Sequence, residues 1–133
     1  MKQLFASLAA LSLAATAAPA IASAPFEGRW VNPKKSVIIE VAPCGQAYCG
    51  TVVWATDRAK ANARKGGTAN LIGTRLISGV RQTGNGTYKG RGFVPKQNIH
   101  APATIRVAGN NTLIVKGCAL GFICKEQRWT RVD

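Results

Sequence analysis

Acidic residues are scarce in this sequence. It has 5 Asp and Glu against 18 Lys and Arg, a formal net charge of +13, although charged residues make up only 17% of its 133 residues. Histidine occurs once, as His100. No nucleophile elbow, phosphate-binding loop or metal motif is present. We therefore expect no catalytic residue, no cofactor and no metal site.

An acid/base site would have to come from very few carboxylates. A cross-strand pair such as Glu40 with Glu126 has the right chemistry for general acid/base catalysis, but nothing in the sequence indicates that these two converge. A hydrolase is therefore the weakest of three functions considered. The acidic residues are Glu27, Glu40, Asp57, Glu126 and Asp133.

The sequence also lacks an apolar run long enough to span a membrane, which takes about 20 residues. Its N-terminus instead has one basic residue, Lys2, followed by a short Ala/Leu run that ends in small residues. This pattern predicts a secretory signal peptide over residues 1–22, cleaved after Ala22 or, alternatively, after Ala24. The rest, 23–133, is long enough for one domain. We expect it to be secreted across the inner membrane into the periplasm.

Four cysteines, an even number, follow the predicted leader, which is typical of disulfides formed in an oxidising compartment. Their spacing favours two local bridges, Cys44–Cys49 and Cys118–Cys124, and a cross-pairing such as Cys49–Cys118 stays open. Zinc sites and redox-active pairs have closer spacings, typically C-x2-C, so structural disulfides are the favoured interpretation.

Short segments of alternating or β-branched residues, separated by turn signals, predict a run of strands. In 36–42, for example, Val37, Ile39 and Val41 share one face. In 47–55 the alternation places Tyr48, Val52 and Trp54 on one face and Cys49, Thr51 and Val53 on the other. One stretch has helical composition: Asp57 is its expected N-cap, Gly66 and Gly67 its expected stop, and we expect an exposed element outside the core. The expected strands are 28–31, 36–42, 47–55, 75–82, 87–94, 103–107, 112–117 and 122–132.

Eight strands with short links predict an all-β fold, an up-and-down antiparallel barrel with one short helix or excursion near residues 57–66. Such a barrel is just wide enough inside for side chains or one small ligand. Closure of the sheet would also remove exposed strand edges.

Several motifs together resemble the secreted bacterial family called domain of unknown function 2147, over about residues 26 to 132. The resemblance implies a lipocalin-like barrel and no known function, so no catalytic residue is implied. The chain differs from the family pattern at Tyr88 and over 95–100. The motifs are Gly28-x-Trp30, Tyr48-Cys49-Gly50-Thr51-Val52-Val53-Trp54 with Asp57, Leu71-Ile72-Gly73, Gly117-Cys118 and Gln127-Arg128-Trp129-Thr130-Arg131.

Two groups of residues are candidates for a site. Gly28, Trp30, Trp129 and Arg131 would meet where the first and last strands pair. The resemblance to lipocalin-like barrels implies a basic residue over the Trp30 ring, either Arg131 or Arg128. We interpret this group as packing at a closed barrel end, with a ligand platform as the alternative. Trp54 and Tyr88 combine apolar faces with polar atoms and would line the open end, with packing in the core as the alternative that such residues more often adopt. Arg91 is the third ligand-binding candidate.

The positive charge forms two groups, one in the helical stretch and one on the fourth and fifth strands. An excess of positive charge attracts anions. The leading hypothesis is a monomer that binds a small apolar or amphipathic envelope ligand at its open end. The alternative is an electrostatic binder of anionic envelope polymers or an acidic protein, and export argues against nucleic acid as partner. The two groups are Arg58, Lys60, Arg64 and Lys65, and Arg75, Arg81, Lys89 and Arg91.

Overall fold

The computed structural model describes residues 9–14, 25–119 and 123–132. Residues 9–14 have no regular secondary structure, and the rest of the predicted leader, with both candidate cleavage points, lies outside the described residues. The signal peptide therefore stays a prediction.

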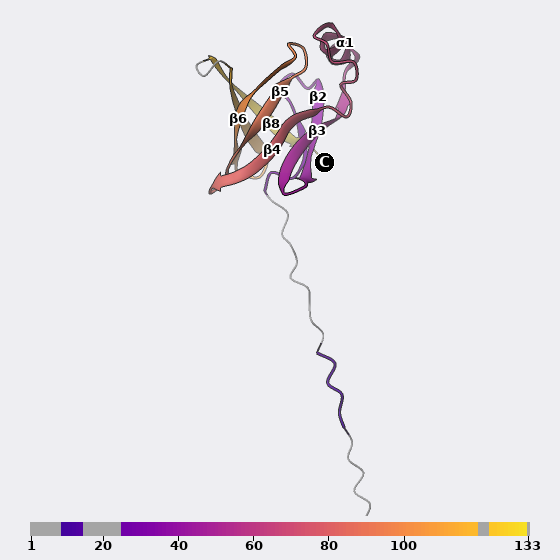
Figure 1. Cartoon of the computed structure of the whole chain (residues 1–133), viewed down its shortest axis with the longest axis vertical. Coiled ribbons are helices and arrows are strands. Elements are labelled where there is room, and N and C mark those ends of the chain that lie inside the picture. The colour runs from indigo at the N-terminus through magenta and orange to yellow at the C-terminus, as the bar shows by residue number, and fades with distance from the viewer. Residues whose placement is uncertain (1–8, 15–24, 120–122, 133) are drawn as a thin grey trace, which may run out of the picture.

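Eight antiparallel strands form a closed barrel in sequence order (Figure 1). The first strand pairs with the second and also with the last, with Trp30 opposite Ile39 on one side and Arg131 on the other. The predicted fold class is confirmed, including its one short helix. The elements are β1 (Gly28–Val31), β2 (Val37–Cys44), β3 (Ala47–Ala55), α1 (Asp57–Lys65), β4 (Arg75–Gly84), β5 (Thr87–Val94), β6 (Ile99–Ala108), β7 (Thr112–Ala119) and β8 (Ile123–Val132).

The connections gather at two ends because consecutive strands run in opposite directions. At the end that we call the turn end, tight hairpins join β2 to β3, β4 to β5 and β6 to β7. Each contains a glycine with positive φ, namely Gly45, Gly86 and Gly109, a conformation that costs other residues more. The opposite end, which we call the helix end, carries α1 and the β5–β6 connection (Figure 1).

Alternating side chains fill the barrel. The face of β2 that carries Ile39 and Val41 is the inner one, since both are buried and pair with Val52 and Gly50 of β3. Full burial of an aliphatic or aromatic side chain contributes about 1.5–3 kcal/mol. The largest fully buried side chains are Trp30, Phe26, Ile39, Ile105, Leu113, Val41, Val52 and Val80.

A β-bulge corrects the predicted faces of β3. Ile39 pairs with Val52, but Ile38 pairs with Trp54, so Val53 is an extra residue in β3. Beyond a bulge the alternation is shifted by one residue. Trp54 therefore lies on the outer face beside Ile38 and is 46% exposed, whereas the sequence placed it with Tyr48 and Val52.

Strand β6 begins at Ile99, four residues before the expected start at 103, although it contains Pro102. Val107 N–H donates to the Gly86 carbonyl oxygen at 3.0 Å, on the β5 side of β6. Because backbone N–H and C=O groups alternate sides along a strand, those of the even-numbered residues of β6 point toward β7. The pairing with β7 ends at Ala103, so no residue of β7 pairs with Pro102. The missing N–H of Pro102 therefore removes no hydrogen bond between the two strands. His100 is thus an exposed strand residue stacked on Phe93, with ring centroids 4.6 Å apart.

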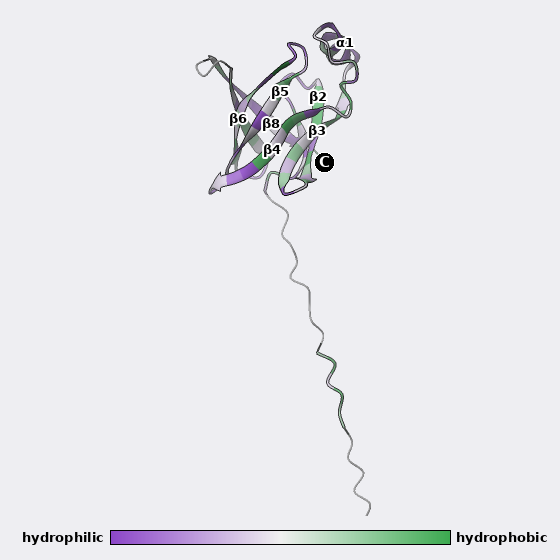
Figure 2. Cartoon of the chain, viewed as in Figure 1, coloured by the Kyte–Doolittle hydropathy of each residue, from purple (hydrophilic) through white to green (hydrophobic). Residues whose placement is uncertain are grey.

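Helix α1 differs from the expectation in two ways. Its N-cap is Thr56, whose hydroxyl accepts a hydrogen bond from Ala59 N–H at 3.1 Å, and Asp57 is the first helical residue. Although the helix is hydrophilic over most of its length (Figure 2), Ala63 is 2% exposed and belongs to the hydrophobic core. The helix is therefore anchored to the barrel and is not only an exposed excursion.

Candidate functional site

The turn end is filled by aromatic side chains. Phe26 is fully buried and contacts Tyr88 and Tyr48, with ring centroids 4.1 and 4.8 Å away. Tyr88 is only 2% exposed, and burial raises the pKa of its phenol, with smaller contributions from Tyr48 and Glu27. At this end the interior is a packed core, and Tyr88 is part of it.

Arg131 covers the Trp30 indole at the seam between β8 and β1. Its guanidinium carbon lies 4.3 Å from the ring centroid. The guanidinium also donates to the carbonyl oxygens of Glu27 at 2.7 Å and Pro25 at 2.6 Å, and Nε donates to Asn110 O at 2.8 Å. The indole Nε1 in turn donates to the Phe26 carbonyl oxygen at 2.8 Å.

Gly28 is required for this arrangement, because its φ is +116° and a Cβ there would lie 2.8 Å from Arg131 Nη1. Trp129 completes the group on the inner face of β8, where it is 7% exposed and donates to Gln127 Oε1 at 3.1 Å. The geometry of the group is that of packing at a barrel end.

The three candidate ligand-binding residues do not share one site. Tyr88 lies near the turn end, Trp54 lies near the helix end on the outer face, and Arg91 is exposed on the outer face of β5, opposite Ser78 and Pro102. Trp54 lies on the outer face because of the bulge in β3, and Tyr88 lies in the core because it packs against Phe26. The two residues expected together at an open end are thus at opposite ends.

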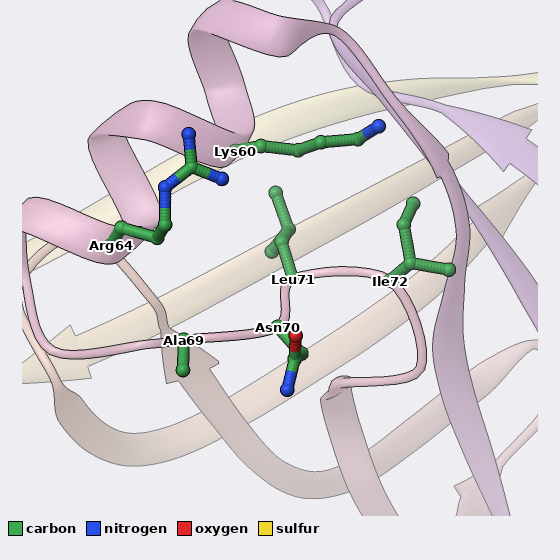
Figure 3. Close-up of a pocket in the computed structure, with 6 residues that line it drawn as sticks. All are labelled: Lys60, Arg64, Ala69, Asn70, Leu71 and Ile72. Carbon is green, nitrogen blue, oxygen red and sulfur yellow. The ribbon is translucent and has the colours of Figure 1, made fainter.

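A cavity of about 270 Å³ lies at the helix end. Two cations from α1 and two apolar residues from the α1–β4 connection form its walls, and Figure 3 shows Leu71 and Ile72 pointing from that connection toward the helix. Its lining residues are Lys60, Arg64, Ala69, Asn70, Leu71 and Ile72.

Hydrogen bonds to β3 hold the apolar wall of this cavity in place. Gly73 N–H donates to Val52 O at 2.8 Å, and Val52 N–H donates to Thr74 O at 2.9 Å. Leu71 is 5% exposed and belongs to the barrel core, so the cavity floor is continuous with that core. Ile72, by contrast, is 44% exposed and offers a free apolar surface.

The far end of α1 is tied to the β5–β6 connection. Thr68 Oγ1 donates to Pro95 O at 3.0 Å. Gly66 lies so close to Lys96 that a Cβ would clash with the Lys96 backbone. The helix therefore crosses the helix end from β3 to the β5–β6 connection and carries the cationic wall with it.

The cationic wall consists of two residues one helical turn apart. Lys60 and Arg64 are an i, i+4 pair of like charge, an arrangement that destabilises a helix by about 0.2–0.5 kcal/mol when no anion is present. Asp57 lies 3.9 Å from Lys60, but its side chain is fully exposed. An anionic group at the cavity would relieve the repulsion.

Small and polar residues lie on the inner wall of the barrel toward this end. Gly92, Ala101 and Gly117 face inward near the helix end and have little or no side chain. Gln127 shares the inner face with Trp129 yet is exposed. A side chain on an inner face is exposed only where solvent reaches the interior.

Sequence reasoning missed the cavity, although it noted the charges. In the sequence, Lys60 and Arg64 are part of one basic stretch with Arg58 and Lys65, and Leu71-Ile72-Gly73 is only a motif of the family. The i, i+4 spacing of the two cations was the available signal. Their position over Leu71 depends on the course of residues 66–74, which has no regular secondary structure.

Two disulfides close hairpins at opposite ends of the barrel. Cys44–Cys49 joins β2 to β3 at the turn end, and Cys118–Cys124 joins β7 to β8 at the helix end. The predicted local pairing is confirmed. Two such bonds are consistent with an oxidising, extracytoplasmic compartment.

Other features of the described residues bear on the class of site. Among residues 9–14, 25–119 and 123–132, no three His, Cys, Asp or Glu side chains gather as metal ligands would. In the same part of the chain, no helix has the length and apolar character needed to cross a membrane.

An eight-stranded up-and-down barrel with paired first and last strands is the architecture of lipocalin-like proteins. Protein HP1028 from the human pathogen Helicobacter pylori, described as belonging to the lipocalin family, has a similar solved structure, with a TM-score of 0.61 and 15% identity over 80% of this chain and 82% of that chain. At this identity the likeness shows the fold alone.

The chain itself belongs to the family described as uncharacterized protein conserved in bacteria (DUF2147), whose model matches residues 28–131. No curated protein matches the sequence.

Proposed function

We propose that this protein is a non-catalytic binding protein of the bacterial envelope that holds a small amphipathic ligand with an anionic head group at the helix end. The observation that carries the proposal is the cavity of about 270 Å³ with Lys60 and Arg64 on one wall and Leu71 and Ile72 on the other. The cations match an anionic head group, and the apolar wall matches a short hydrocarbon portion.

The size and position of the cavity support a small ligand. Its volume lies just below the usual range for small-molecule sites, about 300–1,000 Å³. The polar head would lie toward solvent beside α1, and the apolar part would lie on Leu71, where burial contributes about 25 cal/mol per Å².

Titration with two amphiphiles of the same chain length tests this proposal. One has an anionic head (a lysophosphatidylglycerol) and the other a neutral one (an alkyl maltoside), both below their micelle concentrations. Calorimetry measures the affinity, and the fluorescence of Trp54, the exposed tryptophan near the helix end, reports any local change. We expect the anionic amphiphile to bind at least about tenfold more tightly, since a charge-assisted hydrogen bond contributes about 1.5–3 kcal/mol.

Two sets of variants separate the cavity from general charge. Lys60→Gln with Arg64→Gln removes the cationic wall, and Arg58→Gln with Lys65→Gln removes the same charge from the same helix outside the cavity. Ile72→Ser removes the apolar contact at an exposed position that folding tolerates. The first and third variants should lose affinity for the anionic amphiphile, and the second should keep it. Equal affinity in all of them, or no binding to the wild type, would reject the proposal.

We also propose that the mature protein is a periplasmic monomer. The two disulfides and the bacterial family support export. Osmotic shock of cells that express the full chain should release the protein, and mass spectrometry should find its N-terminus at Ser23 or Pro25. Retention of residues 1–22 in a cytoplasmic product would contradict export, and light scattering of the released protein tests the monomer.

A further inference from the structure

A band of cations crosses the outer face of five consecutive strands, away from the cavity. All six are exposed and point outward, on the opposite face from Tyr88, Ile105, Leu113 and Trp129. We call this set the cationic belt: Arg81 on β4, Lys89 and Arg91 on β5, Arg106 on β6, Lys116 on β7 and Arg128 on β8.

The strand register makes these residues neighbours. Arg81 lies directly opposite Lys89. Lys89 is opposite Thr104, which in turn is opposite Lys116. One row further along, Arg106 and Arg128 lie on either side of Ile114. The belt is therefore continuous from β4 to β8.

Among the described residues, four of the six belt cations, Arg81, Lys89, Arg91 and Arg106, have no acidic residue opposite them or two residues away on their own strand. Like charges directly opposite one another destabilise a strand pair, as Arg81 and Lys89 do here. Within the described part of the chain, the two ion pairs are Arg29–Glu40 and Lys60–Asp57, and neither includes a belt residue. Glu126 lies opposite Lys116, at one edge of the belt. Anions that offset the charge of Arg81, Lys89, Arg91 and Arg106 must come from outside.

Packing between two of the arginines supports a defined surface. Ile114 points outward, yet it is only 5% exposed. Its cross-strand neighbours on that face are Arg106 and Arg128. We infer that the apolar stems of these two arginines cover Ile114 while their charged heads stay in water.

The curvature of the belt selects the shape of the partner. Arg81 and Arg128 are on β4 and β8, four strands apart in a closed barrel of eight, so they face opposite sides of the cylinder. A flat membrane surface contacts only part of such a belt at one time. A flexible chain that runs across the strands reaches all of it, over roughly 19 Å for four strand spacings of about 4.8 Å.

We propose that the cationic belt binds a flexible linear polyanion that winds around the barrel wall from β4 to β8. The surface is independent of the helix-end cavity, because no belt residue lines that cavity. The chemistry recognised is a chain of closely spaced phosphate or carboxylate groups, which six cations in three adjacent cross-strand rows contact together.

Long-chain polyphosphate is the probe, with binding measured by calorimetry over a series of salt concentrations. If about 0.7 counterions are released per contact, as for single-stranded nucleic acids, six contacts give a slope of roughly −4 in log affinity against log salt. A fourfold rise in salt then weakens binding roughly 300-fold. Triphosphate, which is too short to span the belt, should bind much more weakly.

A matched pair of triple variants locates the surface. Arg81→Gln/Lys89→Gln/Arg106→Gln removes half of the belt, and Lys34→Gln/Arg58→Gln/Lys65→Gln removes the same charge at exposed sites outside both belt and cavity. The belt variant should lose about two units of salt slope and bind about tenfold more weakly or worse, and the control should lose far less. Circular dichroism checks that both fold.

Two further probes decide the class of partner. Vesicles of phosphatidylglycerol should bind more weakly than polyphosphate at equal phosphate concentration. Single-stranded DNA that binds through the belt without base preference would support the same phosphate-chain chemistry. Equal losses in the two triple variants, or vesicles that bind more tightly than polyphosphate, would overturn the proposal.

Discussion

Arg131 lies over the Trp30 ring, 4.3 Å from guanidinium carbon to ring centroid, and this contact joins the last strand to the first. The same guanidinium donates hydrogen bonds to the carbonyl oxygens of Pro25 and Glu27, and Nε donates to that of Asn110. One side chain thus holds the segment before β1, the β6–β7 turn and the indole together. The seam of the barrel is fastened by this side chain as well as by the strand ladder.

Arg131→Gln should destabilise the barrel by about 2–4 kcal/mol. A cation–π contact contributes about 0.5–2 kcal/mol, and hydrogen bonds from a charged donor contribute about 1.5–3 kcal/mol. Urea unfolding measures the loss. Arg131→Lys keeps the charge over the ring but not the planar set of donors, so it should be intermediate. If Arg131→Gln unfolds at the same midpoint urea concentration as the wild type, the stability of the seam does not depend on this residue.

Gly28→Ala should be more costly than Gly109→Ala. Both glycines have positive φ, but a Cβ at Gly28 would lie 2.8 Å from Arg131 Nη1, and one at Gly109 would meet nothing within 4 Å. Backbone strain costs of order 1–3 kcal/mol and is larger at Gly28, because its φ of +116° lies outside the left-handed helical region and the +66° of Gly109 lies within it. The difference between the two variants therefore contains both this strain and the clash. In an Arg131→Gln background that difference should shrink, which a double-mutant cycle detects.

Removal of either disulfide should cost about 2 kcal/mol by loop entropy, because each closes a small loop. The pairs lie at opposite ends, so the Cys44→Ser/Cys49→Ser and Cys118→Ser/Cys124→Ser losses should add to within about 0.5 kcal/mol. Chemical unfolding of the two double variants and the quadruple variant tests this. A quadruple loss well beyond the sum would mean that the two ends are coupled.

The barrel should lose stability as the pH rises above about 10. Burial raises the pKa of Tyr88, so the phenol ionises in the unfolded chain before it ionises in the native barrel. Its contribution is complete below the unfolded pKa and is lost as the pH rises through the native one. Tyr88→Phe should therefore remove this part of the pH dependence of urea unfolding. Identical alkaline profiles for the two proteins would contradict the assignment.

Acrylamide should quench mainly one of the three tryptophans. Trp54 is 46% exposed, whereas Trp30 and Trp129 are buried. Trp54→Phe should therefore remove most of the quenchable fluorescence, and Trp129→Phe should not. Strong quenching that survives in Trp54→Phe would place Trp54 inside the barrel, on the face that strict alternation predicts.

The strands were largely predictable because most of them follow local rules. Val37, Ile39 and Val41 alternate with polar or outward positions, and Gly45, Gly86 and Gly109 mark hairpins. The start of β6 was not predictable from local rules, because Pro102 argues against a strand. The strand tolerates Pro102 only because β7 does not pair with this residue. Where β7 ends its pairing cannot be read from the local sequence of β6.

The sites were less predictable for a similar reason. Residue type suggested Trp54 and Tyr88, but one extra residue in β3 turned Trp54 outward, and Phe26 from before the first strand covered Tyr88. The cationic belt depends on register across five strands, so Arg106, Lys116 and Arg128 joined Arg81 and Lys89 only once the pairing was known. The disulfide partners were close in sequence and needed no such information.

The pairing of β1 with β8 places Arg29 opposite Val132, so both ends of the domain lie together at the turn end. A short linker from Val132 back to Pro25 therefore needs to bridge little space, and the exposed turn at Asn85 offers a place to open new termini. A circularly permuted barrel of this kind would begin at β5 and keep Phe26 and Arg131 within one continuous stretch of chain.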